Sequence, residues 1–176
     1  MIFTPLTLPG AYRIAPEPHP DDRGWFGRMF CQEEFKAHGL NPCVAQCNLS
    51  YNKVTGTLRG LHYQAAPHAE AKLIRPLTGA ICAVMIDLRP ESPTYKAWIA
   101  HELRAETFEM LYTPEGIANG FLTLEDNTQV FYQMSEFYHP ESAHGIRWND
   151  PAFGIAWPAA PRVISSRDQQ YPDTGL

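Results

Sequence analysis

Short segments of apolar and polar residues with a two-residue period follow one another through most of the chain. Residues 44–51 alternate in this way, as expected for a strand with one buried face. The predicted strands are residues 25–30, 44–51, 56–64, 73–77, 80–88, 95–101, 108–112, 120–124 and 128–134. Turn-forming residues separate them, as at Thr78–Gly79 and Pro114–Gly116. Regular short strands with such turns predict an all-β sandwich or barrel.

Helical patterns are confined to two short stretches. Residues 31–38 have the composition of a short helix, which Gly39 is placed to end. Residues 165–171 are expected to begin a second short helix, after a loop-like and aromatic stretch at residues 145–158. No linker, repeat or change of composition divides the chain, so we expect one domain over residues 1–176.

Composition and charge narrow the class of protein. The chain is 44% hydrophobic and 19% charged, as expected for a folded domain with a substantial core. The net charge of −5 argues against a broad basic surface, so we expect no nucleic-acid partner. The sequence has neither an apolar run long enough to span a membrane nor a signal peptide, and its four cysteines form no CxxC pair or zinc pattern. These features predict a cytoplasmic protein with free thiols and no membrane partner.

Gly60 interrupts the strand predicted at residues 56–64, between Arg59 and His62. A regular strand would point Arg59 and His62 to opposite faces, because they are three residues apart. A glycine inside a strand often marks a bulge, which can turn a side chain to the other face. The strand alone leaves two readings open: a hydrogen-bonded core histidine with a surface arginine, or two functional side chains.

The neighbouring residues resemble the two-part motif of the cupin superfamily. The matching segments are Gly56-x5-His62-x-Gln64 and Pro114-x-Gly116-x2-Asn119. In metal-binding cupins, two histidines and a glutamate in the first part and a histidine in the second part hold the ion. Here the amides Gln64 and Asn119 stand at two of the histidine positions, and Glu70 is off the usual glutamate spacing. One imidazole with two amides is a poor ligand set for a divalent transition metal, so we expect no metal in the barrel.

A closer resemblance is to the dTDP-4-dehydrorhamnose 3,5-epimerase family, and it runs from Asp22 to Asp168. The matching motifs include Asp22-Arg23-Gly24-x-Phe26, Gln46-x-Asn48-x-Ser50, Leu58-Arg59-Gly60-Leu61-His62-Tyr63-Gln64, Ser92-Pro93-Thr94-Tyr95 and Gly145-Ile146-Arg147-Trp148-Asn149-Asp150-Pro151. The resemblance implies a cupin-type jelly-roll barrel or sandwich with a few short helices and no cofactor. It also implies a homodimer with swapped N-terminal strands. The implied substrate is a nucleotide-diphosphate 4-keto-6-deoxy sugar, such as dTDP-4-dehydro-6-deoxy-D-glucose, which would become dTDP-4-dehydro-L-rhamnose.

That reaction requires proton transfer at carbons next to a carbonyl. Removal of the C3 or C5 proton gives an enolate, so the site needs a base, a group that stabilises the oxyanion and an acid on the opposite face. His62 is the expected base because histidine titrates near neutral pH without a large shift. By resemblance, Asp168 is its partner, Lys72 faces the developing oxygen charge and Tyr132 is the acid.

Each of these roles has a structural alternative. Asp168 follows Ser165 by three residues and can belong to a helix cap. Tyr132 can be an ordinary strand aromatic, with Tyr138 as a rival acid, and Lys72 can be a solvated lysine.

The expected substrate-binding residues are charged, amide and aromatic side chains. Arg59 and Arg167 are suited to a diphosphate, because the guanidinium group binds phosphate with two parallel hydrogen bonds. Gln46 and Asn48 are two residues apart, so one strand face can present both of them. The resemblance implies that Arg23 and Phe26 reach the partner subunit's site and hold the nucleotide base. Asn119 and Tyr138 complete the set.

The sequence departs from the family pattern at two positions, and it leaves several alternative activities open. Many members have glutamate at the position of Arg28 and histidine at that of Asn119. The departure at Arg28 leaves the identity of the nucleotide open, and the departure at Asn119 leaves open whether one or both carbons are epimerised. The alternatives are a 3-only or 5-only epimerase, a 3,4-ketoisomerase acting on another nucleotide sugar, a metal cupin, and a sugar-nucleotide binding module without turnover.

Overall fold

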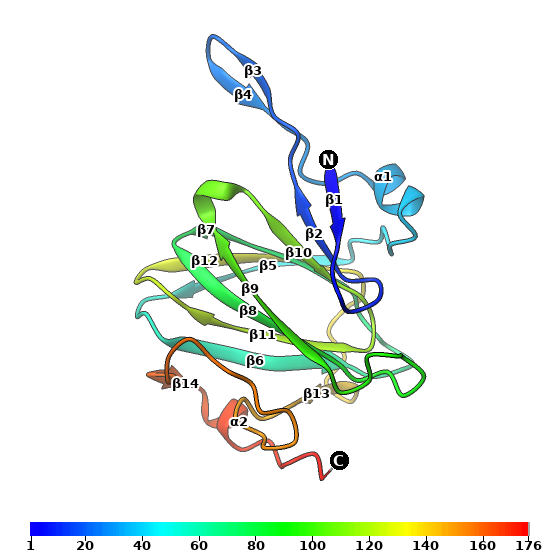
Figure 1. Cartoon of the computed structure of the whole chain (residues 1–176), viewed down its shortest axis with the longest axis vertical. Helices are drawn as coiled ribbons and strands as arrows, with labels where there is room; N and C mark the ends of the chain where they lie inside the picture. Colours follow the sequence, from blue (N-terminus) through cyan, green and yellow to red (C-terminus); the bar gives the residue numbers. More distant parts are fainter. Residues whose placement is uncertain (176) are drawn as a thin grey trace.

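Two antiparallel sheets face each other across the centre of the molecule in the computed structural model (Figure 1). The structure describes residues 1–175, so Leu176 of the predicted 1–176 domain lies outside the described residues. Within this part of the chain, no helix has the length and apolar character needed to cross a membrane.

The first sheet has six strands, and every neighbouring pair is antiparallel. In spatial order they are β1 (Ile2–Pro5), β2 (Tyr12–Ala15), β10 (Met110–Thr113), β7 (Lys72–Thr78), β12 (Thr128–Met134) and β5 (Gln46–Asn52).

The second sheet faces the first and carries the strand predicted around Gly60. In spatial order its strands are β13 (Ala143–Gly145), β6 (Thr57–Gln64), β11 (Ile117–Thr123), β8 (Ala80–Asp87) and β9 (Trp98–Arg104), with β14 (Val163–Ile164) paired in parallel to β6. From β5 to β12 the chain changes sheet at most connections, which is the path of a jelly roll. The all-β, cupin-type prediction is confirmed as two facing sheets that do not close into a barrel.

Strand β8 is buried along its whole length. Its odd-numbered residues, such as Ile81 and Met85, pack between the two sheets. Its even-numbered residues, such as Val84 and Ile86, pack on the outer side against the C-terminal segment that includes Ile146 and Phe153. A strand covered on both faces has no polar side, which explains the nearly continuous apolar run of this segment. The second sheet is therefore the middle of three layers.

Helices occupy only the edges of this framework. They are α1 (Gln32–Ala37), the 3-10 helix η1 (Ala105–Thr107) and α2 (Ser166–Gln169). The two predicted α-helices are confirmed, and Gly39 follows α1 with a left-handed φ of 71°.

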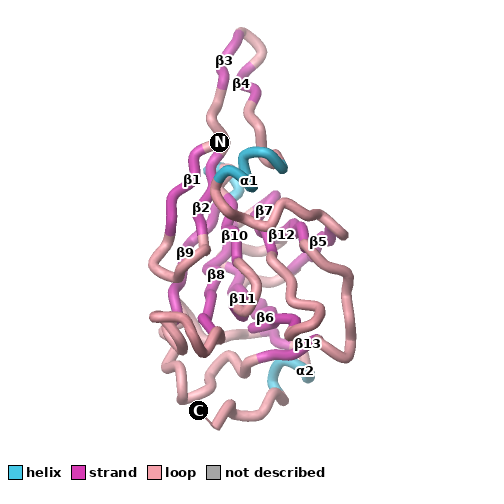
Figure 2. The backbone as a smooth tube through the Cα atoms, turned by 90° about the vertical axis from the view of Figure 1, so that its right-hand side faces the viewer, coloured by secondary structure: helices cyan, strands magenta, loops and turns pink. Residues whose placement is uncertain are grey.

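A separate hairpin, β3 (His19–Asp21) with β4 (Gly24–Phe26), projects away from both sheets (Figures 1 and 2). The strand predicted over residues 25–30 is therefore too long. After Phe26 the chain has no strand to pair with, and Met29 and Phe30 instead pack beside α1.

Two other predicted strands begin too early because non-glycine residues adopt left-handed backbone. Lys96 has a φ of 68°, so β9 begins at Trp98 rather than at residue 95. Phe108 has a φ of 58°, so β10 begins at Met110 rather than at residue 108. The Phe108 ring packs against Trp25 with centroids 4.8 Å apart and under the Arg75 guanidinium. These contacts with Trp25 and Arg75, which are distant in the sequence, stabilise the turn at Phe108.

Candidate active site

A cavity of about 580 Å³ opens between the two sheets. This volume is in the usual range for small-molecule sites. Residues from β5, β7 and β12 of the first sheet, β6 and β11 of the second, and the C-terminal segment line it. Eight of the predicted site residues lie at this cavity: Asn48, Arg59, His62, Lys72, Asn119, Tyr132, Arg167 and Asp168.

A bulge at Gly60 places Arg59 and His62 on the same face. His62 is opposite Asn119 and Arg59 is opposite Phe121, so four residues of β6 span three of β11. Arg59 and His62 both line the cavity as a result. Gly60 has a φ of 116°, and a Cβ at this position would lie 2.6 Å from the Cα of Gly120 on β11. The bulge predicted from the sequence is confirmed, and only glycine fits at its centre.

His62 and Asp168 form a direct pair. The Nε2 atom of His62 lies 2.8 Å from Oδ1 of Asp168, and the other carboxylate oxygen accepts the backbone N–H of Gly60 at 3.1 Å. Burial raises the pKa of Asp168, but hydrogen bonds from His62, Gly60 and Ser165 outweigh that effect and hold it below the ordinary value. The carboxylate is therefore an anion that accepts a hydrogen bond from Nε2–H, which leaves Nδ1 of His62 as the nitrogen without a hydrogen in the neutral ring.

The helix-cap alternative for Asp168 is also present, and it involves different atoms. The Ser165 hydroxyl accepts the backbone N–H of Asp168 at 3.1 Å. The Asp168 carboxylate accepts from His62 and from the Gly60 backbone on β6, and Ser165 also helps to lower its pKa. Ser165 thus fixes the helix while Asp168 faces the cavity.

Tyr132 and Lys72 lie on neighbouring strands of the opposite sheet. Burial raises the pKa of Tyr132, while a hydrogen bond with Ser50 and the nearby Arg59 charge act in the other direction. Its phenol is neutral at physiological pH and can donate a proton. The Nζ atom of Lys72 lies 2.7 Å from Oε1 of Glu70 and 3.4 Å from Oδ1 of Asn119.

The sequence reasoning missed Glu70 as the partner of Lys72 and Tyr171 as a neighbour of His62. Glu70 is two residues before Lys72, so the spacing of an extended segment, which places alternate residues on one face, was a usable signal for this pair. Tyr171 is far from His62 in the sequence, and spacing gives no signal for it. The ring of Tyr171 meets His62 edge-on with centroids 6.2 Å apart. A Cβ at Gly145 would overlap this ring, so the close approach requires glycine there.

Arg167 lines the cavity, whereas Tyr138 lies outside its lining. The pKa of Arg167 is raised by a hydrogen bond with Tyr138 and by the nearby Tyr171 phenol. Tyr138 is 56% exposed, and its backbone N–H donates to the Gln46 side chain at 3.2 Å. Gln46 is used in this loop contact and does not line the cavity, although Asn48 two residues later does.

Arg23 and Phe26 lie on the projecting hairpin, away from this cavity (Figure 1). Phe26 is 73% exposed, and the Arg23 guanidinium pairs with Asp21 at 2.6 Å. Arg28, just beyond the hairpin, pairs with Glu34 of α1 at 2.8 Å. The structure does not bring Arg23 and Phe26 to the cavity of their own chain, so their predicted role requires a second subunit.

A cupin-type jelly roll whose cavity holds an imidazole–carboxylate pair, a lysine and a neutral tyrosine is the framework of an acid–base enzyme. The chain belongs to the dTDP-4-dehydrorhamnose 3,5-epimerase family, whose model matches residues 5–174. It is accordingly an enzyme of the isomerase class, as the motifs predicted.

Individual relatives extend over nearly the whole chain. The dTDP-4-dehydrorhamnose 3,5-epimerase of Methanothermobacter thermautotrophicus is 40% identical over 96% of this chain and 92% of its own length. The crystal structure of the Elizabethkingia anophelis enzyme of the same name superposes with a TM-score of 0.95 at 34% identity, covering 99% of this chain and 96% of that one. ChmJ from Streptomyces bikiniensis, a 3′-monoepimerase in complex with dTDP-quinovose, gives a TM-score of 0.87 at 34% identity, covering 96% and 85%. A protein described as a monoepimerase thus has a similar fold.

Proposed function

We propose that this enzyme epimerises a dTDP-linked 4-keto-6-deoxy sugar at C3, C5 or both, as in the conversion of dTDP-4-dehydro-6-deoxy-D-glucose to dTDP-4-dehydro-L-rhamnose. The observation that carries the proposal is the 2.8 Å His62–Asp168 pair, which faces Tyr132 and Lys72 in one cavity. Family membership and the names of the relatives support the substrate class.

His62 is the base in this proposal. Its Nδ1 atom takes the proton from the carbon next to the 4-keto group, and Asp168 stabilises the imidazolium that forms. The electron pair of the C–H bond moves onto the keto oxygen as an enolate. Asp168 therefore interacts most strongly with His62 once the proton has been transferred. An interaction that is stronger in the transition state than in the ground state accelerates the step.

Lys72 stabilises the enolate oxygen. A unit charge about 4 Å away contributes roughly 4 kcal/mol at an effective dielectric constant near 20. Glu70 restricts the position of the ammonium, since its carboxylate is 2.7 Å from Nζ. Oδ1 of Asn119 also accepts a hydrogen bond from this ammonium at 3.4 Å and limits its movement further.

Tyr132 returns a proton to the opposite face of the carbon. The first sheet supplies Tyr132 and the second sheet supplies His62, so acid and base approach the sugar from different sides of the cavity. Water then reprotonates the tyrosinate and takes the proton from His62, which leaves no net proton change. Tyr138 is disfavoured as the acid because it lies outside the cavity lining.

Arg59 and Arg167 bind the diphosphate in this proposal. Arg59 is held in position by a hydrogen bond from Nε to Oδ1 of Asn52 at 2.7 Å and by one from a terminal nitrogen to the Tyr51 carbonyl oxygen at 3.5 Å. The other terminal nitrogen is left for a phosphate oxygen. We further propose a homodimer in which the β3–β4 hairpin of one subunit brings Arg23 and Phe26 to the nucleotide base in the other. The exposure of Phe26 on a projecting hairpin supports this arrangement.

Deuterium exchange tests the proposed function directly. The protein is incubated in D₂O with dTDP-4-dehydro-6-deoxy-D-glucose and with other nucleotide-linked keto-sugars, and the products are followed by NMR. Deuterium should enter C3, C5 or both in the wild type, and His62→Ala should abolish this exchange. His144→Ala, at an exposed histidine on β13, is the matched control. No exchange by the wild type with any of these sugars would refute the proposal.

The same spectra separate the alternatives. Exchange confined to one carbon identifies a monoepimerase, of the kind that ChmJ represents. Movement of the keto group from C4 to C3 identifies a ketoisomerase.

A further inference from the structure

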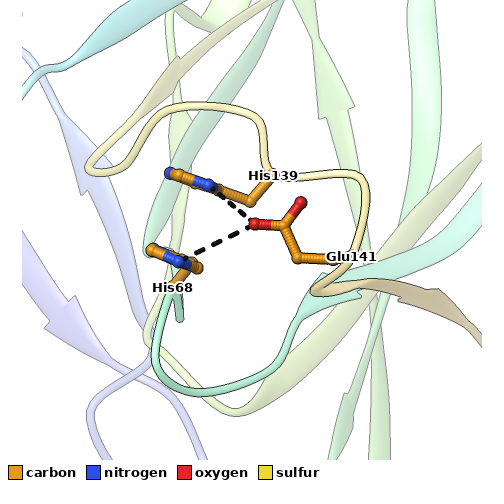
Figure 3. A group of neighbouring side chains, drawn as sticks. All are labelled: His68, His139 and Glu141. Atoms are coloured by element: carbon orange, nitrogen blue, oxygen red, sulfur yellow. Dashed lines mark hydrogen bonds and ion pairs between the residues drawn. The ribbon is translucent and has the colours of Figure 1, made fainter.

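Two histidines and a glutamate meet outside the cavity, on loops that follow β6 and β12. His68 lies between β6 and β7, while His139 and Glu141 lie between β12 and β13. The imidazole rings of His68 and His139 stack with centroids 3.5 Å apart and planes 6° apart. Oε1 of Glu141 is 3.2 Å from Nδ1 of His139 and 3.9 Å from Nε2 of His68 (Figure 3). None of the three lines the cavity described above.

Gln64 holds the two loops together beneath these side chains. Its buried amide donates to the carbonyl oxygens of His68 and Phe137, both at 3.0 Å, and accepts the backbone N–H of His139 at 2.7 Å. The backbones of both histidines are thus bound to one side chain. Gln64 therefore fixes the two loops next to each other, and both the nitrogen and the oxygen of its amide take part in these hydrogen bonds.

We propose that His68, His139 and Glu141 form a binding site for a zinc-type divalent cation at the surface of this enzyme. Three such side chains, with water as a fourth ligand, are a common zinc ligand set. Tetrahedral zinc with bonds of about 2.0–2.1 Å separates its ligand atoms by about 3.3 Å. The 3.2 Å separation between Glu141 and His139 is close to this value, and the 3.9 Å separation between Glu141 and His68 is longer. One imidazole has to rotate out of the parallel stack so that both nitrogens point at the ion.

The charge of the surroundings favours a cation. Glu136 adds a second carboxylate 4.0 Å from Nε2 of His139.

Cation binding would connect two loops at the edge of the substrate cavity. The first loop leads through Glu70 into Lys72, and the second carries Tyr138, which contacts Arg167. The ion would therefore stabilise the loops without touching the reacting carbons. This role is independent of the proton-transfer chemistry of His62.

Calorimetric titration tests the site. The full-length protein is treated with EDTA, dialysed into metal-free buffer and titrated with ZnCl₂. We expect one zinc per chain, and at least a tenfold loss of affinity in His139→Ala and in Glu141→Gln. Glu141→Gln preserves the side-chain shape, so its result stands if His139→Ala fails to fold by circular dichroism. His144→Ala, which changes an exposed histidine outside the cluster, should bind zinc like the wild type.

Co²⁺ in place of zinc gives a second readout, because its visible absorption distinguishes four-coordinate from six-coordinate sites. A four-coordinate spectrum in the wild type that is lost in Glu141→Gln would support the proposal. Absence of saturable zinc binding by the wild type would overturn it, as would wild-type affinity in both cluster variants.

Discussion

Replacing Asp168 by asparagine tests the base directly. The two carboxylate oxygens accept from His62 and from the Gly60 backbone. Asparagine has only one oxygen. If that oxygen stays with the Gly60 N–H, the amide NH₂ faces Nε2 of His62 and favours the tautomer with the proton on Nδ1. That tautomer has no free lone pair toward the substrate, so the variant loses both a charge and the correct proton position.

The magnitude follows from the geometry of the pair. Opposite unit charges 2.8 Å apart attract by about 6 kcal/mol at an effective dielectric constant near 20. His62 is half-exposed to the cavity, and solvent screening reduces this value to roughly 3–5 kcal/mol. We therefore expect kcat to fall about 10²- to 10⁴-fold. KM should change little, because the carboxylate acts through His62 rather than on the substrate.

Initial rates of deuterium entry at saturating substrate measure this loss. Ser165→Ala is the control, because it removes the acceptor for the Asp168 backbone N–H and keeps the carboxylate. It should cost about 1 kcal/mol of stability and much less activity. A folded Asp168→Asn enzyme with a kcat within about threefold of the wild type would contradict this account of the base.

Three further changes test the fold and the acid. Gly60→Ala should lower the free energy of unfolding in urea by at least about 3 kcal/mol, because its Cβ would meet the facing backbone at 2.6 Å. Gly24→Ala is the control, because Gly24 has a φ of 129° but open space around it, and it should lower the free energy of unfolding by roughly 1 kcal/mol. Equal losses in the two variants would refute the steric argument. Tyr132→Phe should lower the rate of formation of epimerised product, measured by NMR, about 10²- to 10⁴-fold, while removal of the substrate proton persists. Tyr138→Phe should form product at nearly the wild-type rate. A large loss in Tyr138→Phe with a small loss in Tyr132→Phe would instead make Tyr138 the acid. Asp87→Asn should destabilise the protein by about 3–5 kcal/mol at pH 7, because this buried carboxylate accepts from a guanidinium and two hydroxyls. Burial raises the pKa of Asp87, but these bonds bring it well below the ordinary value, so the stabilisation is present above about pH 4 and should shrink as pH falls; urea unfolding with a difference equal at pH 7 and pH 3 would contradict this assignment.

The parts of the fold that depend on local pattern could be predicted from the sequence. The alternation at residues 44–51 corresponds to β5, and the glycine within residues 56–64 is a bulge. Strand starts near Lys96 and Phe108 were wrong because tertiary contacts and turns hold these residues in left-handed backbone. Lysine and phenylalanine rarely adopt such conformations, so neither residue gave a local signal for them.

In the candidate site too, residues on strands could be predicted from the sequence, whereas residues on loops could not. Residues fixed by strand geometry, such as Arg59 and His62, were placed correctly once the bulge was expected. Gln46 and Asn48 share a strand face, but only Asn48 lies within the cavity because Gln46 is at the strand end and binds a loop. The neighbour Tyr171 depends on the route of a loop, which the two-residue period does not determine.

The proposed base and its carboxylate partner belong to different layers of the molecule. His62 is fixed in the middle sheet, whereas Asp168 and Arg167 are carried by the four-residue helix α2 on the C-terminal segment. The two side chains share this one short helix, so any substitution that shifts α2 would displace Asp168 from Nε2 of His62 and Arg167 from the cavity together. The geometry of the proposed proton transfer and that of the proposed phosphate binding therefore depend on the same four residues.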